Sequence, residues 1–334
     1  MQKVDIVYTY VDGSDAKWLT KKSLVEEKLL GRTTHASSSS RFIDNEELKY
    51  SLRSIDKFAT WVNNIFIVTD DQIPSWLNLA HPKIKIIDHK DIFSKEEYLP
   101  NFNAKAIETQ IHHIKELSEH FIYFNDDMFL GRITKPADFF DINGKPRIFV
   151  SEIIPIPNKN AYRFDKREES KKNDYQESVI NTRILYKNYF GKKIYYNIRH
   201  GVKTLLKSVL VELELLFPNE VHTTAANKFR SGQDLMMFHL CQFYCIDKKL
   251  GKPVYLQSIG NTSKLKNLLM LNNHNSFYFI NLDNNNLAAS LQNITKTPPF
   301  VFCLNQTPST PVKNLEVMKT FLENYFPNKS QYEK

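Results

Sequence analysis

The stretch FIYFNDDMFLG, residues 121–131, decides the fold class predicted for this chain. Its first four residues form a short apolar and aromatic run typical of a buried strand, and Asn125, Asp126 and Asp127 follow at once. Two adjacent carboxylates repel each other at a dry strand end unless a cation neutralises them. One interpretation is a divalent cation that also holds a diphosphate, because Mg²⁺ takes carboxylate and phosphate oxygens together. In the other, one acid caps the next turn and its neighbour is solvated.

Further runs upstream have the same character. Buried strands are predicted at 3–11, 64–71 and 83–89. Apolar residues at helical spacing predict helices at 44–58, with Asp44 or Asn45 as N-cap, and at 104–117. Strands that alternate with helices indicate an α/β fold with a mostly parallel central sheet, whose ligands bind beyond the carboxyl ends of the strands. Acids follow several of these strands, namely Asp12, Asp70, Asp71, Asp88, Asp126 and Asp127.

The pattern weakens elsewhere along the chain. Residues 19–40 are polar, end in four serines and are expected to form a loop, and 271–293 are Asn-rich and loop-like. The charged stretch 158–182 is expected to be a solvated loop or a helix-rich excursion. Later helices are predicted at 202–217, 233–249 and 314–326.

Composition bounds the class of protein. The chain has 334 residues, of which 42% are hydrophobic and 13% aromatic, and this excludes a largely disordered protein. Its three cysteines form no disulfide framework, which fits a reducing compartment. No signal peptide and no apolar run of about 18–20 residues is visible, so we expect a cytoplasmic protein.

The net charge of +8 has two interpretations. It is either the background of a soluble protein from a Lys-rich proteome, or it attracts anions such as nucleotide phosphates, a lipid-linked acceptor or an anionic membrane face. The second would place the protein peripherally at the inner face of the membrane. We expect no nucleic-acid partner, because the basic residues are dispersed and no aromatic-interleaved basic motif occurs. The sequence predicts no oligomeric state.

Four regions together resemble the Stealth proteins. They are DIVYTYVDGSDAKW at 5–18, the long segment from Arg41 to Arg132, His200 followed by NKFRSGQDL at 227–235, and FCLNQ at 302–306. The Stealth family comprises sugar-1-phosphate transferases of bacterial capsule and exopolysaccharide synthesis, related to the animal enzyme that makes the mannose-6-phosphate mark. The resemblance implies a nucleotide-sugar-transferase sheet of the GT-A-like type.

The same resemblance implies a reaction. A hydroxyl of a growing glycan attacks the phosphorus that bears the sugar of a UDP-sugar, UMP leaves, and a phosphodiester forms. A conventional glycosyltransferase would instead attack the anomeric carbon and release UDP. The domains expected are a nucleotide-sugar-binding α/β core at 1–150, a charged insertion at 151–201 and a helical part at 202–334 that completes the active site, all within one catalytic unit.

Site residues follow from the matching positions. The expected catalytic residues are Asp126, Asp127, His200 as proton shuttle and Arg230 as phosphate clamp. Mg²⁺ or Mn²⁺ is expected on Asp126, Asp127 and Asn305. The expected substrate-binding residues are Asp12, Gly13, Arg41, Asp44, Asn45, Arg53, Asn103 and Asn125. From the residues alone, Arg53 could equally pair with Asp56 or Glu46 on its own helix.

Two further positions bear on metal binding. The family usually has an acid where this chain has Gln306, so an uncharged amide stands at that place. His112, His113 and His120 also suggest a metal site, since His113 and His120 would share one face of the predicted helix. We do not expect that site, because His112 and His113 would face different directions on the helix.

Overall fold

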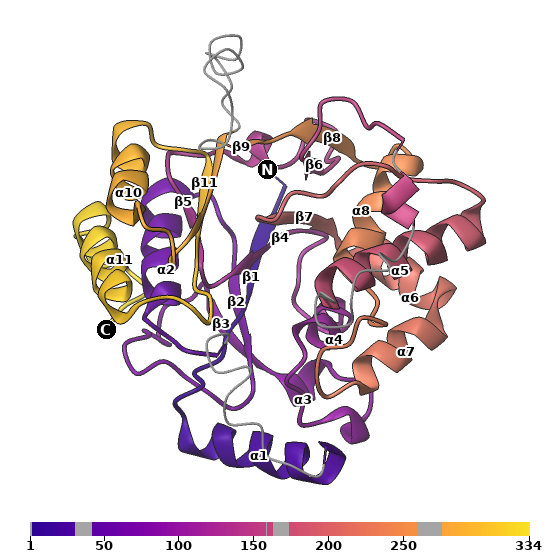
Figure 1. Cartoon of the computed structure of the whole chain (residues 1–334), viewed down its shortest axis with the longest axis horizontal. Coiled ribbons are helices and arrows are strands. Elements are labelled where there is room, and N and C mark those ends of the chain that lie inside the picture. Colours follow the sequence, from indigo (N-terminus) through magenta and orange to yellow (C-terminus); the bar gives the residue numbers. More distant parts are fainter. Residues whose placement is uncertain (1, 31–41, 158, 163–173, 259–275) are drawn as a thin grey trace.

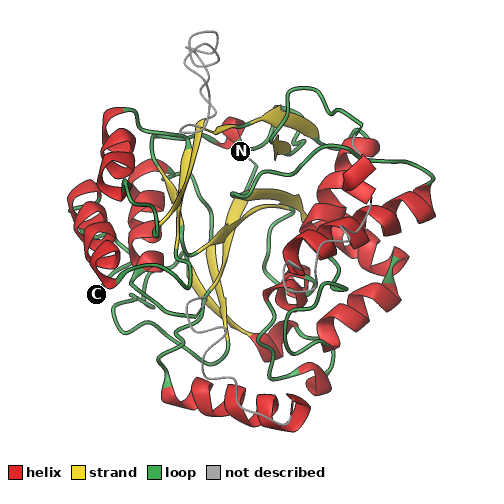
Figure 2. Cartoon of the chain, viewed as in Figure 1, coloured by secondary structure: helices red, strands yellow, loops and turns green. Residues whose placement is uncertain are grey.

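The structure is a computed structural model of the whole chain. It describes residues 2–30, 42–157, 159–162, 174–258 and 276–334 (Figure 1). A central sheet runs through the middle of the molecule, with helices on both of its sides (Figure 2).

The central sheet has five strands in the order β3-β2-β1-β4-β7. The first four are parallel to one another, and β7 is antiparallel to β4. Register places Thr9 opposite both Val68 and Asn125, so β1, β2 and β4 end at one edge of the sheet. The predicted α/β class with a mostly parallel sheet is confirmed. The strands are β1 (Val4–Thr9), β2 (Ile65–Thr69), β3 (Ile84–Asp88), β4 (His120–Asn125) and β7 (Lys203–Leu206).

One face of the central sheet packs on helices from the middle of the chain. Val7, Val68 and Tyr123 share a buried cluster with apolar residues of these helices, and β-branched and aromatic side chains suit such a doubly covered sheet. Figure 1 shows these helices together to the right of the sheet. They are α4 (Ala104–Glu108), α5 (Asp174–Phe190), α6 (Lys207–Leu216), α7 (Pro218–Ala226) and α8 (Met237–Asp247).

The other face packs on α2 (Glu47–Phe58). Leu48, Leu52 and Ile55 of α2 lie in the cluster beneath the central sheet, whereas Tyr50 belongs to a further cluster under a second sheet. This second sheet has the order β5-β11-β10-β9, and α10 (Leu287–Lys296) and α11 (Val312–Tyr325) cover it. Its strands are β5 (Met128–Leu130), β9 (Gln257–Ser258), β10 (Ser276–Asn281) and β11 (Val301–Asn305).

The remaining elements are short or peripheral. β6 (Arg147–Val150) pairs with β8 (Lys252–Tyr255), and α1 (Ala16–Leu30) lies at the bottom of Figure 1. A single turn of helix, α3 (His89–Ile92), follows β3. The 3₁₀ turns are η2 (Glu96–Tyr98), η3 (Ile111–His113), η4 (Pro136–Asp138) and η5 (Lys159–Tyr162).

The loop predicted for residues 19–40 is wrong over its first part, because α1 continues to Leu30; residues 31–41 lie outside the described residues. The Asp15 carboxylate accepts a hydrogen bond from the Trp18 backbone N–H at 2.7 Å and so caps the helix. Trp18 is buried against the rings of Phe42 and Phe102. The contacts that hold α1 in place are therefore made with residues distant in sequence, and the weak apolar periodicity of α1 could not predict them.

The single helix predicted over 104–117 is also wrong. The structure has α4 to Glu108 and then the separate turn η3 at Ile111–His113. The Thr109 hydroxyl donates to the Ala106 carbonyl oxygen at 2.6 Å, a local bond that competes with continuation of the helix.

Two later predictions are wrong where residues form strands of a sheet instead. The helix predicted from 202 begins as strand β7, because Lys203 to Leu206 complete the edge of the central sheet beside β4. The Asn-rich stretch predicted as a loop contains β10 and the start of α10 in its described part. β7 belongs to the third predicted domain and bonds to β4 of the first, and β11 bonds to β5. The three-part division of the chain stays a prediction.

Candidate active site

Four carboxylates gather where β1 and β4 end, and we call them the acidic group: Asp44, Glu47, Asp126 and Asp127. Asp126 and Asp127 directly follow β4. Tyr10, just beyond β1, donates its hydroxyl hydrogen to Asp44 at 2.7 Å. The charges of Asp127, Glu47 and Asp44 all act on Asp126. Carboxylates therefore do gather at this edge of the sheet. They come from two separate segments, one with Asp44 and Glu47 and the other with Asp126 and Asp127.

A tight turn carries Asp44, Asn45 and Glu47 into the acidic group. The Asp44 carboxylate accepts a hydrogen bond from the Glu46 backbone N–H at 2.8 Å, and Glu46 has the left-handed φ of 67°. Asn45 donates to Glu47 through its backbone N–H at 2.6 Å and through its side-chain amide at 2.8 Å. The predicted N-cap at Asp44 or Asn45 is wrong: Glu46 occupies the N-cap position, and its side chain makes no cap bond.

Burial and mutual repulsion raise the pKa values of the acidic group. For Asp126 burial comes first and the charge of Asp127 second, and together they raise its pKa well above the usual range. Burial also raises the pKa of Asp127 to about 6 and that of Glu47 to about 7. Each shift means that a negative charge is costly at this position, so a bound cation would stabilise the ionised forms.

Asp127 has an oxygen that suits such a cation. Its Oδ2 accepts a hydrogen bond from the Cys303 thiol at 3.2 Å, but its Oδ1 is buried without a hydrogen-bond partner. A buried carboxylate oxygen left unsatisfied is costly, which fits a metal ligand. Among the described residues, no three His, Cys, Asp or Glu ligand atoms converge within 4.8 Å at this place. A metal here would therefore draw on amide, water or phosphate oxygens as well, as Mg²⁺ commonly does.

β11 brings two amides to the acidic group. The Leu304 backbone N–H donates to the Asp127 carbonyl oxygen at 3.1 Å, which brings the end of β11, where Asn305 lies, next to Asp127 in space. Asn305 donates its side-chain amide to Asn281 at 2.8 Å. Gln306 accepts a hydrogen bond from the Asn45 side chain at 2.9 Å. The amide at position 306 thus touches the turn that holds Glu47 without adding another negative charge.

A second set of ionisable side chains lies on the helical side of the sheet. It consists of the acid Glu108 and the nitrogen-bearing side chains of His200, Lys203 and Arg230. We call these four residues the basic group, after its three nitrogen-bearing members. The charges of Arg230 and Lys203 both act on Glu108, whose pKa burial raises to about 7. Burial lowers the pKa of Lys203 to about 8, against the opposing effect of Glu108. His200 is exposed to solvent, yet desolvation and then the Lys203 charge lower its pKa to about 4, so its imidazole is neutral but only weakly basic without a bound substrate. A neutral imidazole at neutral pH can accept a proton.

Tyr123 of β4 lies between the two groups. Its hydroxyl shares a 2.8 Å hydrogen bond with the Thr9 hydroxyl at the end of β1. Burial raises the Tyr123 pKa, and the charges of Glu108, Asp126 and Arg230 all act on it. Members of both groups therefore lie around the carboxyl ends of β1 and β4, which join them into one candidate active site.

Asn103 and Lys105 of the α4 region hold the loop that carries Arg230. Asn103 is fully buried; its amide donates to Asp234 at 2.9 Å and its side-chain oxygen accepts from the Lys105 backbone N–H. The Lys105 ammonium donates to the Ser231 carbonyl oxygen at 2.7 Å. Asn103 therefore has no exposed atom to offer a substrate, and its place is that of a positioning residue.

Asp12, Gly13 and Asn125 lie at the same edge of the sheet. Asp12 accepts hydrogen bonds from the backbone and hydroxyl of Ser14, and its charge acts on Asp44. The Gly13 N–H donates to the Phe42 carbonyl oxygen at 2.6 Å, and a side chain at Gly13 would collide with Phe42. Glycine is needed here for the close approach of two backbone segments. Asn125 is the half-buried last residue of β4.

The structure does not bring Arg53 to this site. Its guanidinium forms a bidentate ion pair with Glu333, at 2.8 and 2.7 Å, and donates to the Phe326 carbonyl oxygen at 2.8 Å. These partners come from the C-terminal segment, and neither Asp56 nor Glu46 is its ion-pair partner. The position of Arg53 is that of a structural clamp, whereas Arg41 lies outside the described residues.

Sequence reasoning missed Glu108 and Lys203. Glu108 ends α4 and Lys203 begins β7, so 95 residues separate them and only the fold brings them together. An acid at a helix end and a lysine in a polar stretch normally predict solvated residues. The one available signal was the expectation that the region after His200 completes the site.

Comparison with known proteins gives the family. The model of Stealth protein conserved region 2 matches residues 41–148, and that of conserved region 3 matches residues 199–247. These segments contain β4 with Asp126 and Asp127 and the β7 region with His200 and Arg230. An α/β protein with a carboxylate-rich strand edge thus carries two Stealth conserved regions. The chain belongs to the Stealth family, and the resemblance noted in the sequence is confirmed.

Curated relatives extend over nearly the whole chain. An exopolysaccharide phosphotransferase of Streptomyces coelicolor is 34% identical over 99% of this chain and 51% of its own length. The exopolysaccharide phosphotransferase CpsY of Mycobacterium tuberculosis is 33% identical over 99% of this chain and 58% of its own length. The chain therefore spans little more than half the length of these relatives.

Among solved structures, the glycosyltransferase GlyE of Streptococcus pneumoniae is similar to this chain at 11% identity and a TM-score of 0.39, with 98% of this chain and 63% of that one covered. Within the described part of the chain, no helix is both long and apolar enough to span a bilayer.

The structural place of Arg53 leads to a first prediction. Arg53→Met leaves the Glu333 carboxylate, whose side chain is only 2% exposed, without its cation. We expect a loss of about 3 kcal/mol in the free energy of unfolding, measured by urea denaturation. The double variant with Glu333→Gln should recover part of this loss. A large fall in affinity for a nucleotide sugar, with unchanged stability, would instead make Arg53 a phosphate clamp.

Repulsion within the acidic group leads to a second prediction. Asp127→Asn removes one of two adjacent charges, so in the presence of a chelator we expect a higher Tm than in the unmodified protein. Addition of Mg²⁺ or Mn²⁺ should raise the Tm of the unmodified protein and leave that of the variant nearly constant. Asp138→Asn, on a surface turn, is the matched control. Equal metal-induced shifts in all three proteins would remove Asp127 from the metal site.

Proposed function

We propose that this chain transfers a hexose- or N-acetylhexosamine-1-phosphate from a UDP-sugar to a hydroxyl of a growing capsular or exopolysaccharide glycan. The names of the curated relatives, exopolysaccharide phosphotransferases, support this class of reaction. The observation that carries the proposal is the meeting of the acidic and basic groups around Tyr123. Phosphoryl transfer needs cations around the transferred group and a proton acceptor beside the attacking hydroxyl.

The proposed reaction is a substitution at phosphorus. The acceptor hydroxyl oxygen attacks the β-phosphorus of the UDP-sugar, and the bond from that phosphorus to the oxygen bridging the two phosphates breaks. UMP leaves with the bridging oxygen, and the sugar stays bonded to the transferred phosphorus. His200, whose depressed pKa keeps it neutral, accepts the hydroxyl proton.

The basic group would stabilise the charge that spreads over the phosphoryl oxygens. The guanidinium of Arg230 is exposed and can contact two phosphate oxygens together. The Lys203 ammonium is buried, so its charge acts with little screening by water. The charges of these two cations act on Glu108, which is itself a second group able to exchange a proton near neutral pH.

The acidic group is the proposed place of Mg²⁺ or Mn²⁺. Asp126 and Asp127 would hold the ion, with Asn305 as a neutral oxygen donor, and the unpartnered Oδ1 of Asp127 fits this role. When bound, the ion would neutralise charge on the diphosphate. Asp44 and Asn45 come from the turn before α2, and Asp12, Gly13 and Asn125 from the strand ends. These residues would line the nucleotide-sugar site.

Localisation and acceptor are part of the same proposal. The charge of +8 favours approach to an anionic acceptor, which could be a glycan on a lipid carrier at the inner face of the membrane. A cytoplasmic site of action fits the use of a nucleotide-activated donor. The identity of the sugar depends on a few pocket contacts.

The released nucleotide and His200 test the proposal together. The chain is incubated with UDP-sugars and an oligosaccharide acceptor, and the nucleotide product is identified by chromatography. We expect UMP, with turnover lowered about 100-fold or more in His200→Ala and donor binding nearly unchanged. His81→Ala, a surface histidine bonded to Gln331, is the matched control and should keep full activity.

Two results would contradict the proposal. UDP as the released nucleotide would indicate a conventional glycosyltransferase that attacks the anomeric carbon. Full activity of His200→Ala would remove this histidine from proton transfer and leave Glu108 as the candidate.

A further inference from the structure

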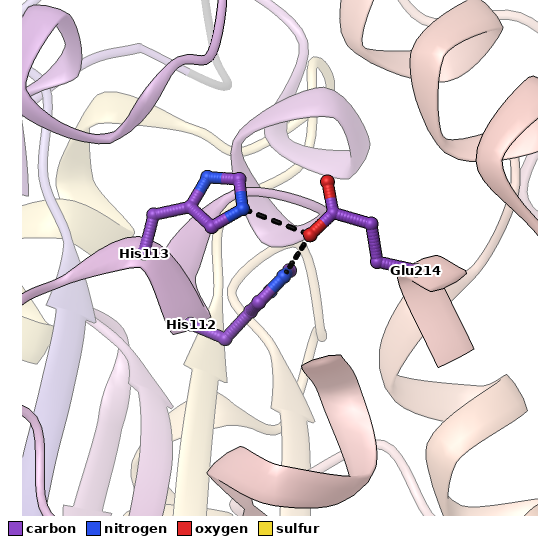
Figure 3. Close-up of side chains that lie close together, drawn as sticks. All are labelled: His112, His113 and Glu214. Carbon is purple, nitrogen blue, oxygen red and sulfur yellow. Dashed lines mark hydrogen bonds and ion pairs between the residues drawn. The ribbon is translucent and has the colours of Figure 1, made fainter. Parts of the chain in front are cut away.

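A cluster of two histidines and one glutamate lies outside the candidate active site: His112, His113 and Glu214. The histidines belong to η3, between α4 and β4, and Glu214 belongs to α6. Figure 3 shows both imidazole rings turned toward the same carboxylate. The Glu214 Oε2 atom lies 2.6 Å from His112 Nε2 and 2.9 Å from His113 Nε2.

The broken helix makes this arrangement. On a continuous helix, neighbouring residues point in different directions, and for this reason the sequence argued against a metal site. Because α4 ends at Glu108 and a separate 3₁₀ turn follows, the two rings lie with their centroids 4.3 Å apart. The expected difference in direction of His112 and His113 is therefore wrong, and His120 takes no part, since its ring bonds to the Gly144 carbonyl oxygen.

The position of hydrogens in the cluster is constrained. His113 Nδ1 lies 2.7 Å from the Ile92 carbonyl oxygen, which can only accept, so Nδ1 must carry the hydrogen. In a neutral His113, Nε2 then presents a lone pair to Glu214, where two acceptors face each other. A cation between them, either a proton or a metal ion, is needed to make the contact favourable.

The surroundings favour a metal ion. His113 donates its other ring N–H to a backbone carbonyl, the usual arrangement of a metal ligand, because it fixes the tautomer and aims the lone pair; the buried Nδ1 of His112 has no hydrogen-bond partner. Two imidazole nitrogens and a carboxylate oxygen, all within 4.8 Å of one another, form one of the ligand sets of Zn²⁺. Among the described residues this is the one group of three such side chains.

Access from solvent also fits. The His112 side chain is fully buried, whereas His113 and Glu214 keep 28% and 21% of their side-chain surface exposed, so an ion can enter from solvent. The positive charge of Lys207 acts on both rings and opposes a second cation, but its ammonium is held by the Ile114 carbonyl oxygen at 2.8 Å. The ligand atoms need to separate to about 3.3 Å for bonds of ~2.0–2.1 Å in tetrahedral geometry.

We propose that His112, His113 and Glu214 bind a transition-metal divalent cation of the Zn²⁺ type. The ion would join the η3 turn to α6. It would thereby fix the segment between Glu108 at the end of α4 and the start of β4, which carries Asp126 and Asp127. It is distinct from the metal proposed for the acidic group, with which it shares no residue.

The test uses the full chain, stripped with a chelator and titrated with Zn²⁺ against a chromophoric competitor. We expect one site per chain, weakened about 10-fold or more by Glu214→Gln and by His113→Gln. His81→Gln and Asp127→Asn should leave the affinity of this site within about 2-fold, since the first changes a histidine elsewhere and the second affects only the acidic group. Circular dichroism confirms that each variant is folded.

A second measurement does not depend on variants. In crystals of the unmodified chain grown with Zn²⁺, an anomalous peak at the zinc edge should lie between His112, His113 and Glu214. The proposal is overturned if the unmodified chain shows no such site, if the peak lies only at Asp126 and Asp127, or if folded Glu214→Gln and His113→Gln bind Zn²⁺ as tightly as His81→Gln. The contact would then be an ion pair between a protonated His113 and Glu214.

Discussion

The repulsion between the Asp126 and Asp127 carboxylates is the constraint on which the candidate active site depends. Burial and this repulsion both raise the pKa of Asp126, so two ionised carboxylates at this strand end are costly unless a cation is bound beside them. The surrounding contacts hold the charge in place. Cys303 on β11 donates to Asp127, Tyr10 beyond β1 donates to Asp44, and the turn before α2 adds Glu47. Hydrogen bonds from three separate segments thus fix carboxylates that a cation would stabilise.

The basic group lies on the other side of β4 from the acidic group and supplies positive charge there. Glu108, Lys203 and Arg230 come from α4, β7 and the loop before α8, and Tyr123 lies within the field of both groups. A diphosphate bound beyond the ends of β1 and β4 would meet the proposed metal at one phosphate and fixed cations at the other. Buried anchors keep the basic side rigid, because Asn103 and Lys105 tie the Arg230 loop to α4. Such preorganisation is what transfer at phosphorus requires.

Much of this could be predicted from local sequence. Short apolar runs that end in acids gave the parallel strands and their acidic edge, since both signals lie within about ten residues. Features that depend on tertiary contacts could not be predicted. Trp18 anchors α1 through rings distant in sequence, β7 is a strand because β4 offers an edge, and Thr109 breaks a helix whose apolar spacing continues. Arg53 likewise found its partner Glu333 far along the chain rather than on its own helix.

The bond proposed to break is the one between the β-phosphorus and the oxygen that bridges the two phosphates. An isotope label in the donor tests this most directly. A UDP-sugar labelled with ¹⁸O at the oxygen joining the anomeric carbon to the β-phosphorus is turned over with acceptor, and the products are weighed by mass spectrometry. Unlike the identity of the nucleotide, this label is unaffected by later cleavage of UDP to UMP. The account predicts that all of the label stays in the glycan product, within its new phosphodiester. Label found in released UDP would show attack at the sugar carbon and would contradict it.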